Sequence, residues 1–363
     1  MSSDTEAIYP VLSQIQLKNF RHWTALNWDI SPSQKVLITG ENATGKSSIL
    51  EAIQYITTGR SWRSTDNRHL IQHQKNQLSC NAHFKTLSGE EQLKVELGRD
   101  RTIYRELNYK KITKLSEITY KFPTLVWSDK LIELVRGSPE VRRKWIDWCV
   151  FHVEPYGKYP IKEMYIAIKQ KQRILQIAPD DIHQLNAIDN VLADYYIQVW
   201  NKRIAYIDKL NILLEQENIK ITNIHPDTLN KDDLLKMMSE KRSSEIKLKR
   251  LVVGPHTDHY KIQLNGYDLK SFGSNGEQLL TSAILLSKQI QQTTTLSRKK
   301  ILLLIDDFST VLDSNHQKYV LSQISQINTQ IIASSTQQHT HYTETLFDTM
   351  FHVEQHTVKQ TLT

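Results

Sequence analysis

Hydrophobic and polar residues alternate in several short segments of the first third of the chain, a pattern typical of β-strands with one exposed face. Residues 12–17 and 25–30 alternate in this way, with a turn at residues 19–22 between them. Residues 36–39 form a continuous apolar and β-branched run, which predicts a buried strand. Shorter alternating segments follow between residues 81 and 115. The pattern therefore predicts an antiparallel sheet beside a core that contains the buried strand.

The middle of the chain has helical periodicity and few glycines. Residues 140–153, 161–177 and 185–217 carry apolar side chains at helical spacing, so we expect three helices with one buried face each. These apolar stripes are more typical of a core than of a ligand site.

Strands and helices alternate again towards the end of the chain. We expect strands at residues 260–264 and 330–333, helices at residues 279–292 and 317–327, and an irregular polar tail past residue 351. Residues 301–305 are all apolar, which predicts another buried parallel strand.

A phosphate-loop motif, G-x-x-x-x-G-K-[ST], lies between the strand at residues 36–39 and a helical pattern at residues 48–56. Its glycines allow the backbone to approach a phosphate closely, and the following helix N-terminus attracts an anion. Lys46 would reach the β- and γ-phosphates, and Ser47 would ligate Mg²⁺. The alternative is a glycine turn that holds nothing, but the strand–loop–helix context favours a nucleotide site. The candidate nucleotide-binding residues are Gly40, Glu41, Asn42, Ala43, Thr44, Gly45, Lys46, Ser47 and Ser48.

Two adjacent carboxylates, Asp306 and Asp307, follow the apolar run at residues 301–305. Ligands bind at the carboxyl ends of strands in open α/β sheets. Asp306 would hold Mg²⁺ and Asp307 would polarise an attacking water molecule. Two buried acids side by side without a metal would be costly, which argues against a purely structural pair.

A Ser-x-Gly turn, formed by Ser274 and Gly276, precedes the helix at residues 279–292. A hydroxyl and free amides at a helix start suit an anion, although this signal alone is weak.

The chain contains 46 Lys and Arg against 39 Asp and Glu in 363 residues, a net charge of +7 that weakly favours a polyanionic partner. Cys80 and Cys149 have neither disulfide nor zinc spacing, which indicates a reduced, cytosolic setting. We expect no signal sequence and no membrane span.

Basic residues gather at two places where they suit DNA phosphates. Two arginines flank Trp62, an arrangement that suits phosphate contact or base stacking but also an ordinary surface loop. A second basic run, residues 241–250, suits phosphates or a solvated helix face equally. Arg21 could reach a nucleotide phosphate or remain solvated. The candidate DNA-binding residues are Arg60, Arg63, Lys247, Lys249 and Arg250.

The order of the phosphate loop, the Ser-x-Gly turn and the paired aspartates is that of an ABC-type ATPase. In that class the Ser-x-Gly turn closes over the nucleotide of a second subunit, so a working site implies a homodimer with two shared nucleotides. We predict an α/β fold: an ABC-type P-loop ATPase head (a mixed sheet with a flanking antiparallel sheet) plus an inserted helical lobe. The head would comprise residues 1–125 and 252–363, and the lobe residues 126–251.

Motifs along nearly the whole chain resemble those of the bacterial RecF family of recombinational DNA repair. They are residues 19–21, residues 59–63, Arg142, Arg143, Asp147, Trp148, Phe151, His152, Glu154, Pro155, residues 254–256, Ser274, Gly276, residues 304–308, Leu312 and Asp313. The resemblance implies an ATPase head related to Rad50 and SMC proteins, with a short helical lobe in place of their long coiled coil.

The same resemblance implies the cofactors ATP and Mg²⁺ and an ATP-dependent homodimer on gapped DNA or at junctions of single- and double-stranded DNA. Slow hydrolysis would release the dimer. RecO and RecR would be its partners in loading RecA, in the cytoplasm at the nucleoid.

Three positions depart from the family pattern. Ala43 stands where the family usually has glycine, Glu277 where its signature turn usually has glutamine, and Thr257 where arginine usually follows Gly-Pro-His. A glutamate near a partner's γ-phosphate would be repulsive unless it is turned away or masked.

Three other functions fit parts of the pattern. One is an ABC ATPase that drives another process such as transport, although nothing identifies a surface for coupling helices. Another is a P-loop kinase for a small molecule, which would work without a Ser-x-Gly turn. The third is an inactive clamp that binds ATP only for assembly.

Overall fold

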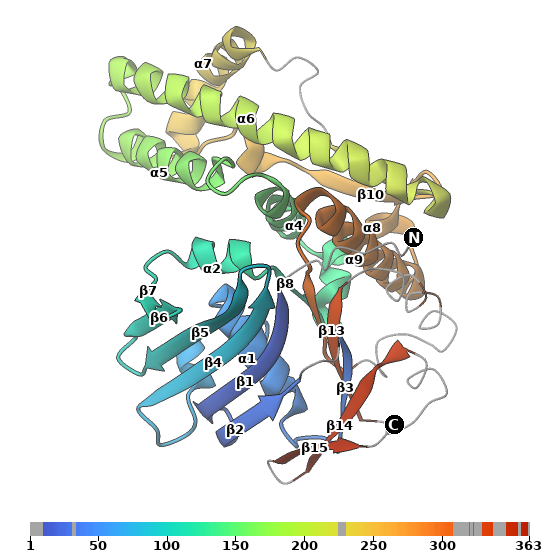
Figure 1. Cartoon of the computed structure of the whole chain (residues 1–363). Helices are drawn as coiled ribbons and strands as arrows, with labels where there is room; N and C mark the ends of the chain where they lie inside the picture. Colours follow the sequence, from blue (N-terminus) through green and yellow to red (C-terminus); the bar gives the residue numbers. More distant parts are fainter. Residues whose placement is uncertain are drawn as a thin grey trace. The chain divides into compact units, whose positions relative to one another are not determined.

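The computed structural model describes residues 10–30, 34–223, 230–307, 319, 322, 329–336, 346–354 and 357–361. The chain forms two compact units (Figure 1). The first comprises Met1–Leu131 and Thr293–Thr363, and the second comprises Ile132–Gln292. Within the described residues, no helix is both long and apolar enough to cross a membrane.

An antiparallel sheet forms one layer of the first unit. Its spatial order is β2 (Trp23–Asp29), β1 (Val11–Phe20), β4 (Gln77–Thr86), β5 (Gly89–Gly98), β6 (Ile103–Leu107) and β7 (Lys110–Lys111). Along β4 and β5 buried residues alternate with more exposed ones, because successive side chains of a strand point to opposite faces. The strands predicted from alternation are therefore confirmed.

A mixed sheet forms the second layer of this unit. Its order is β15 (Thr357–Thr361), β14 (Thr349–Glu354), β3 (Lys35–Thr39), β13 (Gln330–Ser335), β12 (Leu302–Ile305) and β8 (Thr124–Trp127). The strands from β14 to β8 are parallel and β15 is antiparallel to β14. The apolar runs at residues 36–39 and 301–305 are thus buried parallel strands, as predicted.

The expectation of an irregular tail past residue 351 is wrong. β14 extends to Glu354 and pairs with β3, and β15 follows as an edge strand. Met350, Phe351 and Val353 are buried in this arrangement. The polar composition of the edge strand β15 concealed the pairing, because an edge strand needs little apolar surface.

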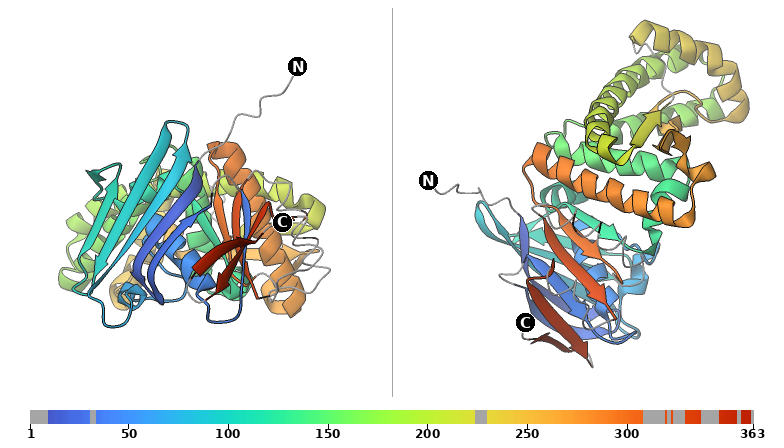
Figure 2. Two further views of the ribbon diagram at one scale, coloured as in Figure 1. Left: turned by 60° about the horizontal axis from the view of Figure 1, so that its bottom comes forward. Right: turned by 90° about the vertical axis from the view of Figure 1, so that its right-hand side faces the viewer.

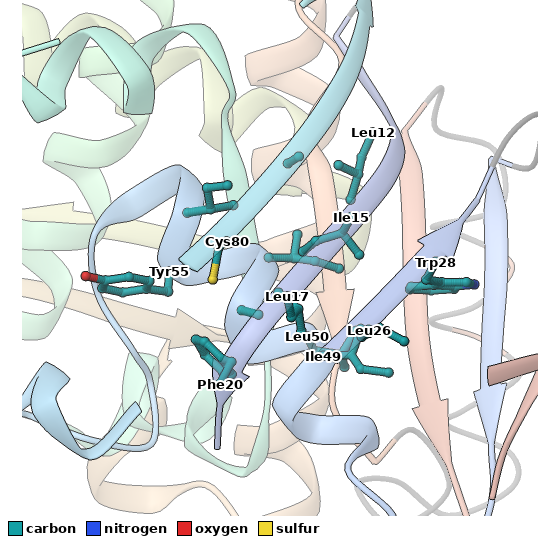
Figure 3. Packing of buried hydrophobic residues seen from close by; sticks show 14 of the residues in the cluster. Leu12, Ile15, Leu17, Phe20, Leu26, Trp28, Ile49, Leu50, Tyr55 and Cys80 are labelled. Carbon is teal, nitrogen blue, oxygen red and sulfur yellow. The ribbon is translucent and has the colours of Figure 1, made fainter. Parts of the chain in front are cut away.

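The core of the first unit lies around helix α1 (Lys46–Thr58), which packs against strands of both sheets (Figure 2). Ile49 and Leu50 of α1 lie next to Ile15 and Leu17 of β1 in a cluster of buried apolar side chains (Figure 3). A short helix, α2 (Leu115–Lys121), precedes β8. The apolar stripe predicted after the phosphate loop is therefore the buried face of α1.

The second unit is mainly helical. Its helices are α3 (Glu133–Arg136), α4 (Pro139–Val153), α5 (Ile161–Ile177), α6 (Ile182–Leu214), α7 (Lys231–Leu248) and α8 (Leu269–Phe272), followed by most of α9 (Asn275–Ser297). A three-stranded sheet in the order β11 (Tyr267–Asp268), β10 (Tyr260–Leu264) and β9 (Ile219–Asn223) completes it. The apolar stripes of α4, α5 and α6 share one buried cluster, so the predicted role of these stripes as core is confirmed.

The boundaries of the two units differ from those expected for the head and the lobe. Residues 252–292 lie with the helices of the second unit, whereas the sequence pattern predicts them in the head. The reason is that Tyr260 and Ile262 of β10 and Leu285 of α9 are buried in the same cluster as α4–α6. Of the predicted helix at residues 317–327 the structure describes only residues 319 and 322, both helical, and the motif residues Phe308, Leu312 and Asp313 lie outside the described residues.

Candidate functional site

The phosphate-loop motif joins β3 to α1, as the sequence predicts. The loop begins after Thr39, and α1 begins at Lys46. Gly45 has φ 103°, and a β-carbon there would lie 2.8 Å from Nε1 of Trp23. Ala43 also has a positive φ, 65°, which explains why glycine is the easier residue at this position. The backbone of the loop is therefore already curved as an anion cradle requires.

Lys46 lies at the centre of this loop. Its Nζ donates hydrogen bonds to the carbonyl oxygens of Gly40 at 2.7 Å and Glu41 at 2.6 Å. Burial lowers the pKa of the ammonium group, while the charges of Asp307 and Asp306 act in the opposite direction. Lys46 is thus a buried cation that is held by neutral acceptors, and a phosphate would be a stronger partner for it.

The paired aspartates lie at the carboxyl end of β12, next to the end of β13. Ser334 of β13 connects them: its Oγ donates to Asp306 Oδ1 at 2.9 Å and accepts from the Asp307 amide at 2.9 Å. Asp307 has φ 52°, an unfavourable conformation for a non-glycine residue. Both acids are half-buried rather than buried as expected, because the strand ends at Ile305.

Ser334 is a site residue that was not predicted from the sequence. Its signal was the polar run Ser334, Ser335 and Thr336 directly after an apolar strand. Since parallel strands end at the same edge of a sheet, that run had to lie beside the residues that follow β12.

The oxygen ligands at this edge fit Mg²⁺. Among the described residues no group donates to Oδ2 of Asp306, and the hydroxyl of Ser47, at the start of α1, has no protein partner. A free carboxylate oxygen and a free hydroxyl are hard ligands, which Mg²⁺ prefers alongside phosphate oxygens. These two residues would hold the ion, which would neutralise phosphate charge when bound.

Arg21 makes different contacts from those expected. Its Nε and Nη2 donate to the carboxylate of Glu51 at 2.9 and 2.6 Å, and Nη1 donates to the His69 carbonyl at 2.9 Å. Glu51 is fully buried on α1 and also accepts from Ser61 Oγ. In this structure Arg21 fixes the turn between β1 and β2, and no hydrogen bond joins it to the phosphate loop among the described residues.

The loop that carries Arg60 and Arg63 surrounds a hollow of about 360 Å³. Among the described residues, 60–65, Asn67 and Lys130 line it, so its wall has three cations, of which Arg63 lies 3.7 Å from the carboxylate of Glu51. Lys130 Nζ donates to the Trp62 carbonyl at 2.6 Å and so joins the loop to the end of β8. The structure thus adds Lys130 to the predicted arginines and makes the loop a concave basic surface.

The Ser-x-Gly turn lies in the second unit at the start of α9. Glu277 Oε2 accepts from the Ser274 amide and hydroxyl, both at 2.8 Å, and the Glu277 amide donates back to Ser274 Oγ at 3.3 Å. This reciprocal pattern is a capping box. The bonds from Ser274 and one from Tyr267 lower the pKa of Glu277. The carboxylate of Glu277 therefore caps the N-terminus of its own helix, and the Ser274 hydroxyl already donates its hydrogen bond to it.

The second predicted basic cluster lies at the end of α7. Lys247, Lys249 and Arg250 are exposed and form no ion pair among the described residues. Arg242, one helical turn earlier, instead bonds Asp189 at 2.9 Å.

Several motif residues of the middle segment meet in the core of the second unit. Arg203 bonds both oxygens of Asp147, at 2.8 and 2.9 Å, and Oδ2 of Asp258 at 2.7 Å. Arg142 donates to the carbonyl oxygens of Val135 and Gly137. Their role in this structure is to hold α4, α6 and the segment before β10 together.

The mixed sheet, the phosphate loop and the paired aspartates define the class of this protein: an ABC-type P-loop ATPase head with a helical lobe. A family model described as RecF/RecN/SMC N terminal domain matches residues 11–359, and the chain belongs to this family. The RecF resemblance read from its motifs is thereby confirmed.

Named relatives agree with this assignment. The chain is 27% identical over 346 residues to the DNA replication and repair protein RecF of Clostridium botulinum (strain Okra / Type B1), covering 90% of this chain and 93% of the relative. It is 27% identical over 343 residues to the RecF of Streptococcus pneumoniae (strain CGSP14), with the same coverage.

Solved structures show the same fold. The recombination mediator protein RecF-ATP of the RecFOR pathway matches with a TM-score of 0.86 and 23% identity, over 99% of this chain and 100% of that one. An SMC head bound to the C-winged helix domain of ScpA matches with a TM-score of 0.58 and 15% identity, over 97% of both chains.

Proposed function

We propose that the protein is an ATP-dependent DNA-binding clamp of recombinational repair and replication-fork maintenance. The observation that carries the proposal is the edge of the mixed sheet where Ser334 holds Asp306 and Asp307 beside a formed phosphate loop. A purely structural turn would have no need of an aspartate at positive φ, or of a buried lysine that forms no ion pair with any described residue.

Each residue of this edge has a role in ATP hydrolysis. The loop amides and Lys46 bind the phosphates, and Ser47 and Asp306 hold Mg²⁺. Asp307 orients the attacking water molecule and accepts its proton.

The Ser274–Gly276 turn supplies the second half of the site from a partner subunit. Ser274 and Gly276 are exposed, and no atom lies within 4 Å of the place where a Gly276 β-carbon would be, so the turn is open to a ligand. Closing two heads on two nucleotides would make the dimer the DNA-binding form and hydrolysis the step that releases it.

DNA binding would rest on phosphate contacts. The basic hollow at residues 60–65 and the exposed cations at the end of α7 suit a backbone of any sequence, and no base-reading motif is present in the sequence. Affinity for gapped DNA should therefore fall steeply with salt and depend little on sequence. DNA would in turn stimulate a weak ATPase. RecO and RecR are the partners that the family relationship suggests.

The decisive experiment is light scattering of Asp307→Asn with and without ATP and Mg²⁺. The variant should keep ATP, hydrolyse it about 100-fold or more slowly, and double its mass only with ATP. Asp208→Asn, the same change at an exposed position of α6, should behave as wild type. A monomer in every condition, including with gapped duplex, would overturn the clamp. Phosphate transfer to an added nucleoside, in place of hydrolysis, would show a kinase.

A further inference from the structure

The hairpin between β6 and β7 has an unusual tip. Its two turn residues, Asn108 and Tyr109, have φ 51° and 63°, the left-handed pair that a two-residue hairpin turn requires. Glycine is the preferred second residue of such a turn, and a bulky residue with positive φ is rare. The Tyr109 side chain is 83% exposed.

The fold explains Asn108 but not Tyr109. The Asn108 amide donates to the Gln92 carbonyl at 2.9 Å, and its Oδ1 accepts from the Gln92 amide at 2.8 Å, so it fastens the hairpin to β5. Within the part of the chain that the structure describes, Tyr109 has no hydrogen bond, ion pair or ring contact. The chain thus keeps a large aromatic ring in water and an unfavourable backbone at the same residue.

The surroundings of the tip are basic. Residues 107–116 contain Lys110, Lys111 and Lys114 and no acidic residue. All three lysines are exposed, and none forms an ion pair among the described residues. The carboxylate opposite Lys111 in the strand register, Glu106, accepts a hydrogen bond from Tyr104.

We propose that this hairpin tip binds an unpaired stretch of DNA, with Tyr109 stacked on one base and Lys110, Lys111 and Lys114 on the adjacent phosphates. The proposal rests on the proposed DNA-binding function and adds the element that recognises the single-stranded side. An aromatic ring can stack only on a base whose face is free, whereas bases within a duplex cover one another. The lysines attract the backbone of any sequence.

The test compares Tyr109→Gly with Gln74→Gly. Gln74 is also exposed, uncharged and at φ 63°, so both changes relieve the same backbone conformation and should raise the thermal midpoint slightly. Fluorescence anisotropy with ATP and Mg²⁺ should show gapped-DNA binding about tenfold weaker for Tyr109→Gly only, with binding to intact duplex unchanged. Tyr109→Phe should bind the gap as wild type.

A second readout locates the contact directly. A 5-iododeoxyuridine placed in the gap should crosslink on irradiation to the peptide that contains Tyr109. Gap binding equal to wild type in Tyr109→Gly, or crosslinks only elsewhere, would overturn the hairpin proposal and leave the clamp standing. Loss of binding to a second protein with DNA binding intact would also overturn it. Wild-type protein that binds neither DNA would instead overturn the proposed function.

Discussion

Both units of the chain bring two carboxylates close to a basic side chain, but they do so in opposite ways. In the second unit Arg203 is fully buried between Asp147 and Asp258, whose oxygens also accept from Tyr159, Trp200 and Tyr260. In the first unit Asp306 and Asp307 are half-buried at a strand end, and Lys46 donates to backbone carbonyls rather than to them.

This difference in hydrogen bonding distinguishes charged side chains that stabilise the fold from charged side chains that are available to bind a ligand. A buried ion pair in which every oxygen and nitrogen is used has no capacity for another partner, and it fixes how the elements pack. The strand-end cluster leaves a carboxylate oxygen, a hydroxyl and an ammonium group that a metal–phosphate complex could engage. Asp147, Asp306 and Asp307 all belong to motifs read from the sequence, and only the hydrogen bonds that their oxygens accept distinguish the structural acid from the other two.

The largest effect is expected from removing the cation of the buried cluster, Arg203. Arg203→Met leaves two buried carboxylates without their cation and should lower the free energy of unfolding by about 3–5 kcal/mol, measured by urea denaturation. Lys202→Met is the matched control on the next residue. Its ion pair with Glu154 is partly exposed, so we expect a loss of at most about 1 kcal/mol. Equal losses in the two variants would show that the buried Arg203 cluster stabilises the fold no more than an exposed ion pair does.

A pH effect should come from His256, which lies beside this cluster. Burial lowers the pKa of His256 from 6.5 to about 4, although the hydrogen bond from its ring to the Leu251 carbonyl acts in the opposite direction. The unfolded chain therefore takes up the proton at a higher pH than the folded chain does. The contribution of neutral, buried His256 to the free energy of unfolding is fully present above pH 6.5 and is lost as the pH falls towards 4. The loss should be about 3 kcal/mol in urea titrations, and His256→Gln should flatten the curve. Identical pH slopes would contradict the assignment.

Removing Lys46, the cation near Asp306 and Asp307, should weaken ligand binding more than it lowers the free energy of unfolding. Lys46→Ala should weaken ATP binding about 100-fold by calorimetry, since hydrogen bonds to charged groups are the strongest that the loop offers. The free energy of unfolding should change little, because Lys46 forms no ion pair among the described residues. Lys18→Ala, an exposed lysine of β1, controls for charge. Unchanged ATP affinity in Lys46→Ala would refute the phosphate-loop assignment.

A smaller effect is expected at the serine that joins the two aspartates. Ser334→Ala frees the Asp306 carboxylate and the Asp307 amide, and should slow hydrolysis about tenfold while raising the Mg²⁺ concentration required. Ser334→Thr keeps the hydroxyl and should restore both. Ser335→Ala is the control, because adjacent strand residues point to opposite faces. If both alanine variants hydrolyse ATP equally, Ser334 does not position the pair.

The smallest effect should come from the capped signature turn. Glu277→Gln keeps an acceptor for the Ser274 amide but removes the negative charge, so ATP should drive dimer formation at severalfold lower protein concentration. Light scattering over a dilution series measures this shift. Glu240→Gln, an exposed change on α7, should leave it unaltered. A dimer that weakens in Glu277→Gln would show that the carboxylate itself supports the closed state.

The local elements and the residue types of the site can be predicted from the amino-acid sequence. Motif spacing and periodicity predict the phosphate loop, the strands at residues 36–39 and 301–305 and the long helices. These patterns lie within short segments and do not depend on the rest of the chain. The capping box of Ser274 and Glu277 is also a local feature, since its two residues are three positions apart, but it was not predicted from the sequence.

Which distant residues meet becomes visible only in the folded chain. Arg21 is held by Glu51, Ser334 joins Asp306 to Asp307, and β14 pairs with β3, each across many residues of chain. Residues 252–292 belong with the helices because the apolar side chains of β10 and α9 are buried there. These contacts depend on which apolar surfaces are buried together and which polar groups then form hydrogen bonds in the folded chain. A local sequence pattern does not contain that information.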